Sequence, residues 1–148
     1  MAAAGIRHAL CGGLAVGAYA RPRATRDIDF LVGEEAYVHH GLLVTMHPAF
    51  PTRAGDVQVD AVPLLPNLVS LEPLLTSSEK SLGVPVISAL GLVAMKLVAG
   101  RMKDRGDVVA LVESGAVDPQ ECRAFLRSYG FEHLVAQFDA LVERAEGE

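Results

Sequence analysis

The residue composition and the spacing of apolar residues change along the chain, and this change limits the folds that it can adopt. Residues 7–66 are rich in β-branched residues, glycine and proline, whereas residues 87–146 carry apolar residues at helical spacing. The pattern predicts an α/β (α+β) fold in which a small mixed sheet is followed by a cluster of helices. A chain of 148 residues suits one domain. We therefore expect a single domain over 1–148, with a sheet-rich core at 1–87 and a helical portion at 88–148.

Turn residues divide these two parts into elements. "IRHAL" reads as a strand that stops at Gly12-Gly13, where a helix begins, and "DIDFLV", "LLVTMH" and "DVQVDAV" read as three more strands. Pro63 and Pro66 are expected to end the sheet, with a short edge strand at "VPVI" after them. Ser88 is a candidate N-cap for a helix, and three further segments continue as helices separated by glycines.

Composition excludes several classes of protein. The chain is 51% hydrophobic and 21% charged, and no apolar run is long enough for a membrane span. It shows no secretory signal, so we expect a cytoplasmic protein without a membrane partner. Cys11 and Cys122 are far apart and are predicted to be free thiols, with Cys11 in the core. The net charge of −5 means that any nucleic-acid contact requires a local basic patch.

Two aspartates stand one residue apart inside a strand-like run, in "RATRDIDFLVG". Side chains alternate along a strand, so Asp27 and Asp29 share one face while Ile28 and Phe30 point into the core. Like charges at this spacing destabilise a fold unless a cation compensates them. Asp60, in "VQVDAV", adds a third carboxylate if that strand lies beside "DIDFLV". Three hard oxygen ligands suit Mg²⁺ or Mn²⁺.

Each of these signals also has a purely structural reading. An isolated Asp-x-Asp is often a solvated strand face, and Gly-Gly is often only a turn. Their combination is more specific, because the backbone N–H groups at a helix start after Gly12-Gly13 can hold a phosphate beside the carboxylates. His39 and His40 are adjacent and would point to opposite faces of a strand, which is poor metal geometry, so we expect a loop there.

The stretch "GGLAVGAYARPRATRDIDFLV" followed by "VQVDAV" resembles the nucleotidyltransferase superfamily that includes DNA polymerase β. The run Arg-x-Thr-x-Asp-Ile-Asp is most similar to that of the minimal and AbiEii-type nucleotidyltransferases of bacteria. The later "KLVAGRMKDRGDVVAL" resembles a helical Lys and Lys-Asp segment of that family, so the likeness covers roughly residues 8–115. The chain is shorter than the two-domain AbiEii-type toxins.

The resemblance implies transfer of a nucleoside monophosphate from a nucleoside triphosphate to an acceptor hydroxyl, with Mg²⁺ or Mn²⁺ as cofactor. It implies that three aspartates are catalytic and hold the metals, with the last of them helping to deprotonate the acceptor: Asp27, Asp29 and Asp60. It implies that the nucleotide is held by a second set of residues: Gly12, Gly13, Arg23, Thr25, Lys96 and Lys103.

The basic residues near the aspartates have two interpretations each. Arg23 and Arg26 either neutralise a phosphate or pair with the aspartates. On a helix continued from Ser88, Lys96 falls on one polar stripe with Lys103 and Asp107, which is either a solvated face or a triphosphate contact with little role in stability.

The acceptor is either RNA or protein. An RNA end would need a local patch of arginines and lysines, whereas a protein hydroxyl would not. The likeness favours a toxin–antitoxin or related defence component with a cognate partner. The alternatives are an antitoxin-type protein adenylyltransferase and a non-catalytic nucleotide-binding or scaffold subunit. The candidate patch joins residues from two segments: Arg21, Arg23 and Arg26 with Arg101, Lys103 and Arg105.

Overall fold

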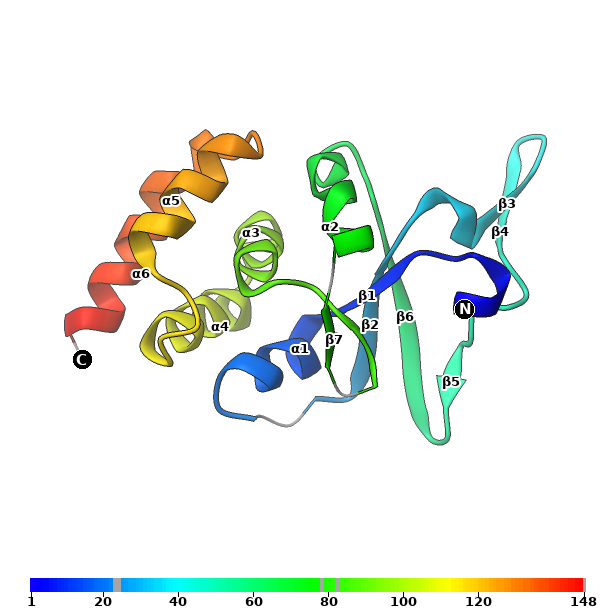
Figure 1. Cartoon of the computed structure of the whole chain (residues 1–148), viewed down its shortest axis with the longest axis horizontal. Helices are drawn as coiled ribbons and strands as arrows, with labels where there is room; N and C mark the ends of the chain where they lie inside the picture. The colour runs from blue at the N-terminus through cyan, green and yellow to red at the C-terminus, as the bar shows by residue number, and fades with distance from the viewer. Residues whose placement is uncertain (23–24, 78, 82, 148) are drawn as a thin grey trace.

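The computed structural model describes residues 1–22, 25–77, 79–81 and 83–147, and its fold is the predicted mixture of sheet and helices. Within these ranges, six strands form one mixed sheet in the order β5-β6-β2-β1-β8-β7, and β3 pairs with β4 in a separate two-stranded sheet. The C-terminal helices gather at one end of the molecule and the β3–β4 hairpin lies at the other (Figure 1). The strands are β1 (His8–Cys11), β2 (Asp27–Val32), β3 (Tyr37–His40), β4 (Leu43–Met46), β5 (Arg53–Ala54), β6 (Val57–Pro63), β7 (Glu79–Ser81) and β8 (Val84–Val86).

Helix α3 has a defined cap at each end. Ser88 caps α3 by accepting a hydrogen bond from the Gly91 backbone N–H at 3.1 Å. Gly100 ends α3 in the left-handed region, at φ 67°, which glycine adopts without strain. The α-helices are α1 (Gly12–Tyr19), α2 (Glu72–Ser77), α3 (Ala89–Ala99), α4 (Met102–Glu113), α5 (Pro119–Ser128) and α6 (Val135–Gly147). The short 3₁₀ turns are η1 (Ala2–Ala4), η2 (Glu34–Ala36), η3 (Val69–Leu71) and η4 (Glu132–Leu134).

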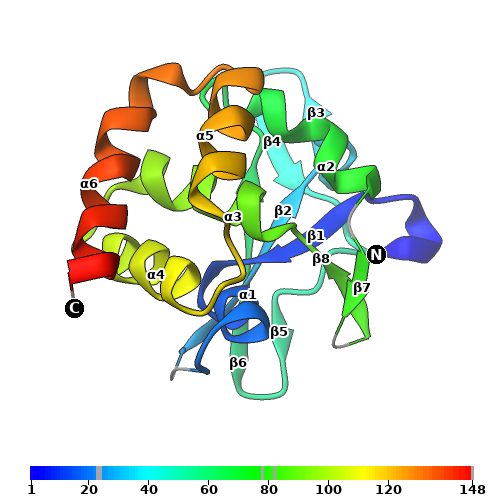
Figure 2. The same ribbon diagram turned by 60° about the vertical axis from the view of Figure 1, so that its left-hand side comes forward.

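Helix α3 joins the two parts of the molecule. Figures 1 and 2 both place it between the sheet and α6. Its residues Leu92, Val93 and Ala94 are fully buried, and they belong to the same apolar core as Leu31 of β2 and Leu126 of α5. The sheet-rich and helical parts therefore share one core. No helix in the described part of the chain is both long and apolar enough to cross a membrane.

The structure corrects four details of the sequence interpretation. The strand expected at "VPVI" is present as β8, but it lies inside the sheet, and β7, which was not predicted, forms the edge. The His39–His40 pair lies on strand β3 and not in a loop. The helix from Ser88 does not continue to Asp107 but breaks at Gly100, so the polar stripe belongs to two helices. Phe30 is buried as predicted, whereas Ile28 is only half-buried.

Candidate functional site

Two of the three predicted carboxylates are direct neighbours across the sheet. Strands β2 and β6 run parallel, with Asp29 opposite Asp60, so both side chains leave the same face of the sheet. Neighbouring strands lie about 4.8 Å apart. Asp27 is on this face as well, two residues before Asp29 and opposite Gln58. The prediction that "VQVDAV" lies beside "DIDFLV" is confirmed, and the register brings the carboxylates together.

Gly12 makes room for the Asp29 carboxylate. Cys11 at the end of β1 is opposite Asp29, so the first residue of α1 comes directly over that side chain. A Cβ atom at Gly12 would clash with Asp29 Oδ2. Gly12 also adopts φ +74°, which other residues rarely adopt. The strand–Gly-Gly–helix connection therefore needs glycine at position 12 for both reasons.

The carboxylates line a cavity of about 340 Å³ between the sheet and the start of the helical part. Its wall includes the apolar residues Leu68, Leu92 and Met95 and charged residues from α3 and α4. The three predicted metal ligands Asp27, Asp29 and Asp60 all contribute to this wall.

The surroundings of Asp29 disfavour its negative charge. Its partial burial raises its pKa above the usual value, and the negative charges of Asp60 and Asp27 raise it further. The positive charges of Lys96 and Lys103 oppose this effect without cancelling it. A carboxylate held in this way gains from any additional cation in the cavity, so the electrostatics and the donor chemistry both suit a hard divalent ion.

The side chains are not arranged around a common point, however. Asp60 Oδ1 accepts a hydrogen bond of 2.7 Å from Gln58 Nε2, a neighbour on the same face of β6 that the sequence interpretation did not include. In the described ranges, no group of three or more His, Cys, Asp or Glu side chains is placed to hold a metal ion. The backbone register thus pairs Asp29 with Asp60, whereas their side chains are not placed as a complete set of metal ligands.

A smaller hollow of about 250 Å³ adjoins the carboxylates on the side of the α1 N-terminus. The N-cap residue Cys11 makes no side-chain hydrogen bond to the first turn of α1. Cations from the loop before β2 and from α4 line the hollow together with this helix start, a combination that can bind an anion. The hollow is lined by Gly12, Gly13, Thr25, Arg26, Asp27, Asp29, Lys96, Arg101 and Lys103.

The environment of Lys96 differs from the one expected from the sequence. It is only 6% exposed, and its Nζ forms ion pairs with Asp104 Oδ1 at 3.3 Å and Asp107 Oδ2 at 2.9 Å. Both aspartates are themselves buried. The charge of Lys96 compensates two buried carboxylates between α3 and α4, which argues against the expectation that Lys96 has little role in stability.

Asp104 also holds Arg101, which the sequence indicates only as a member of a basic surface patch. Its Oδ2 accepts hydrogen bonds from Arg101 Nε at 2.7 Å and from the Arg101 backbone N–H at 3.1 Å. Burial acts to raise the pKa of Asp104, but the Arg101 hydrogen bonds and the charge of Lys96 outweigh it and hold that pKa below its usual value. Asp104 remains ionised and keeps two cations at the cavity wall.

The other residues that the resemblance assigns to nucleotide binding lie in different environments. The Thr25 hydroxyl donates a hydrogen bond of 3.2 Å to the Asp27 carbonyl, so it supports the loop before β2. Lys103 is exposed and lines both the carboxylate cavity and the hollow at the start of α1. It pairs with no carboxylate among the described residues. Arg23 lies outside the described residues. Cys11 is buried, and burial first and the Asp29 charge second raise its pKa to about 12, so it is a core thiol as expected.

Comparisons with known proteins do not extend these observations. No family model matches the chain, and no curated protein matches it.

Proposed function

We propose that the chain is a metal-dependent nucleotidyltransferase that moves a nucleoside monophosphate from a nucleoside triphosphate to an acceptor hydroxyl. One observation carries the proposal: Asp29 and Asp60 face each other in register, directly below the N-terminus of a helix that starts with Gly12. Carboxylates in a sheet normally avoid this arrangement because of their mutual repulsion. A divalent cation bound by the carboxylates, with a triphosphate at the helix N-terminus, would relieve this repulsion.

Each group in the cavity has a role in this reaction. The backbone N–H groups at Gly12 and Gly13 and the side chains of Arg26 and Lys103 would bind the triphosphate. Asp27, Asp29 and Asp60 would hold the divalent metal, which neutralises charge on the phosphates when bound. Asp60 would receive the proton of the acceptor hydroxyl. Lys96 and Arg101, held by Asp104, would keep the cavity wall positive beside the leaving pyrophosphate.

A transfer assay tests this proposal. The protein is incubated with each nucleoside triphosphate labelled at the α-phosphate, with Mg²⁺ or Mn²⁺ and with a cell extract, and labelled RNA is separated from labelled protein. We expect transfer from at least one nucleotide, with loss of about 100-fold or more in Asp29→Asn, as is usual when a charged group of the transition state is removed.

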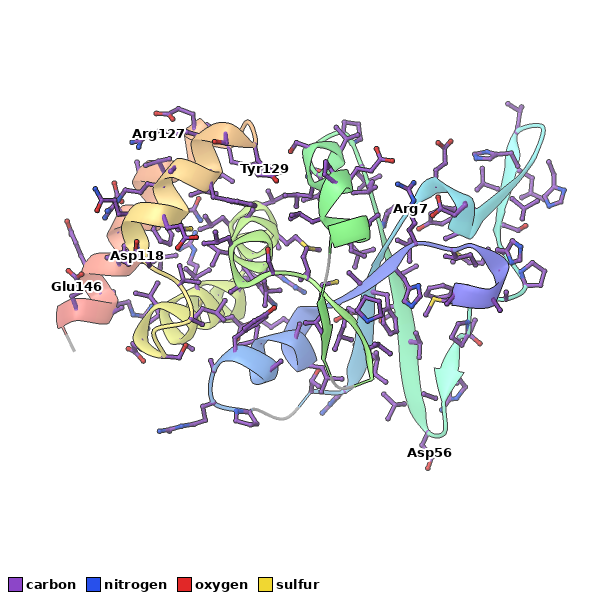
Figure 3. The ribbon with its side chains drawn as sticks, in the orientation of Figure 1. Arg7, Asp56, Asp118, Arg127, Tyr129 and Glu146 are labelled. Carbon is purple, nitrogen blue, oxygen red and sulfur yellow. The ribbon has the colours of Figure 1, made fainter. Side chains whose placement is uncertain are left out.

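Asp56→Asn is a matched control, because it removes the same charge from the exposed turn between β5 and β6. Figure 3 shows Asp56 at the far end of that hairpin, pointing away from the rest of the molecule. Equal activity of Asp29→Asn and Asp56→Asn would contradict the proposal. Nucleotide binding without transfer by the wild type would instead support the reading as a non-catalytic subunit.

A further inference from the structure

Gln58 lies among the carboxylates of the sheet, at a position to which the resemblance assigns no role. It precedes Asp60 by two residues on β6, so both side chains leave the same face of the sheet. The register places Gln58 opposite Asp27 of β2, as it places Asp60 opposite Asp29. Gln58 and the three aspartates are therefore four neighbours on one face, and Gln58 is the uncharged member of the group.

The side chain of Gln58 is directed at one carboxylate of this group. Its Nε2 donates a hydrogen bond of 2.7 Å to Oδ1 of Asp60. Hydrogen bonds to an ionised acceptor are shorter and stronger than those between neutral groups. An ionised carboxylate has about four lone-pair sites, so the amide N–H occupies one of them and leaves the others for a metal ion or for the proton of a hydroxyl group.

The backbone at Gln58 is held from both sides. Strand β6 lies between β5 and β2 in the sheet, as Figure 1 shows. Gln58 is opposite Arg53 on β5 and opposite Asp27 on β2, so both neighbouring strands pair with this residue. A side chain on a strand inside a sheet is placed more precisely than one on a loop. Asp60 therefore accepts its hydrogen bond from a donor with a well-defined position.

The neutral charge of this donor distinguishes Asp60 from the other carboxylate that is held in the cavity wall. Asp104 is held by the cations Lys96 and Arg101, which neutralise its charge. The amide of Gln58 holds Asp60 without a positive charge. Asp60 is therefore oriented and still has its full negative charge to offer to a metal ion.

We propose that Gln58 is a positioning residue of the metal site, which acts by restricting the side-chain rotamers of Asp60 before the divalent ion binds. This inference rests on the proposed function. A ligand that is already ordered loses less conformational entropy when the ion binds. Partners that hydrogen-bond to metal ligands typically contribute a factor of about 10–100 to metal affinity or activity.

Binding of Mn²⁺ to the whole chain, without nucleotide, tests the proposal. The electron paramagnetic resonance signal of free Mn²⁺ gives the Kd for each variant. Gln58→Met keeps nearly the same side-chain length and removes the donor, so we expect its Kd to be about tenfold higher or more. Gln58→Lys keeps a donor but adds a positive charge beside Asp60, so we expect a still higher Kd.

Matched controls make the same two changes far along the chain. Gln120 is at an exposed position of α5, so Gln120→Met and Gln120→Lys should bind Mn²⁺ as the wild type does. Gln58 is also exposed, and we expect Gln58→Met to unfold at the wild-type temperature in a chelator. In the transfer assay, Gln58→Met should need about tenfold more Mg²⁺ for half-maximal rate.

A double-mutant cycle tests whether Gln58 acts through Asp60. An Asp60→Asn chain retains Asp27 and Asp29 as ligands for Mn²⁺. In that chain, Gln58→Met should cause no further change in the Kd for Mn²⁺, because the carboxylate that it orients has been removed.

The outcomes separate this inference from the proposed function. An unchanged or lower Kd in Gln58→Met, in a protein whose wild type transfers nucleotides, would overturn the inference and leave the function standing. A further loss of affinity in the Asp60→Asn chain would overturn it as well, and so would a lower unfolding temperature of Gln58→Met in chelator, because its role would then be structural. A wild type that neither binds Mn²⁺ nor transfers any nucleotide would overturn both.

Discussion

Gly12 links backbone conformation to the candidate chemistry at the level of a single residue. Its left-handed φ can be adopted by alanine only at a cost of about 1–2 kcal/mol. Its missing side chain leaves space that the Asp29 carboxylate occupies. These two effects can be separated, because Gly41 also has a positive φ, of 68°, but has open space where its Cβ would be.

We predict that Gly41→Ala lowers the free energy of unfolding by only about 1–2 kcal/mol, which is the cost of the left-handed backbone conformation. Gly12→Ala should lose more and should also abolish stabilisation by Mg²⁺ with a nucleoside triphosphate, because the Asp29 side chain must move. Urea unfolding with and without these ligands measures both quantities. Equal losses in the two variants would mean that the contact with Asp29 is unimportant.

Lys96 gives a second prediction at this scale. Lys96→Ala leaves the buried carboxylates Asp104 and Asp107 without their shared cation, and removal of one partner from a buried ion pair costs about 3–5 kcal/mol. Lys103→Ala, on the exposed side of α4, should change the free energy of unfolding by less than about 0.5 kcal/mol. Chemical denaturation of the two variants measures the difference, and similar values would contradict the role we assign to Lys96.

At the level of elements, Arg7, which directly precedes β1, connects two later segments to the sheet. Its Nε donates to Glu35 of η2 at 2.8 Å and its guanidinium contacts Glu72 of α2 at 2.9 Å. Figure 3 shows Arg7 between these two elements. Hydrogen bonds from Arg7 lower the pKa of Glu35 from 4.5 to about 2.

We predict that this contact contributes to acid stability. A carboxyl whose pKa is lower in the folded state stabilises the fold above pH 4.5, its ordinary pKa, and that contribution is lost as the pH falls towards about 2. Glu35→Gln should therefore lower the free energy of unfolding at neutral pH. It should also make that free energy decline less steeply between these two pH values. Thermal unfolding measured across this range tests it, and a decline as steep as that of the wild type would contradict it. Glu34→Gln, on the exposed neighbour, is the control.

Element by element, the sequence predicted what local pattern determines and missed what tertiary pairing determines. The run "DIDFLV" became β2 with the bounds read from it, because alternation and the flanking turn residues agree. The strand expected at "VPVI" is present as β8, but its place inside the sheet was not predicted, and β7 was not predicted at all, because proline and short length hide the pattern. The break at Gly100 was missed because apolar spacing continues through it. Burial of Asp104 depends on its partners Lys96 and Arg101, which no local pattern indicates.

At the level of the whole molecule, the sheet-rich and helical parts form one unit around α3. Leu31 in β2 and Leu126 in α5 are both fully buried, in the same core. Leu31→Ala and Leu126→Ala should each cost about 2–5 kcal/mol. Hydrogen exchange of amides in β2 and in α6 should respond equally to either substitution, because a shared core unfolds cooperatively. A response confined to the substituted part would mean two independent units.

The last prediction concerns ligand binding and the stability of the whole chain. Without metal, Asp29 opposes folding at neutral pH, because a carboxyl with a raised pKa destabilises the fold increasingly as the pH rises above its ordinary value of 3.8. In the presence of a chelator, Asp29→Asn should therefore be more stable than the wild type at neutral pH and not at a pH below 3.8.

Addition of Mg²⁺ or Mn²⁺ with a nucleoside triphosphate should reverse the order of the two proteins. A ligand present at 100 times its Kd stabilises the folded state by about 2.7 kcal/mol, and only the wild type retains the paired carboxylates that would hold it. Because the core is shared, the gain should appear in the exchange of α6 amides as well as in β2. Calorimetry and hydrogen exchange on both proteins measure this gain in stability. An equal gain in Asp29→Asn would contradict metal binding by the β2–β6 carboxylates.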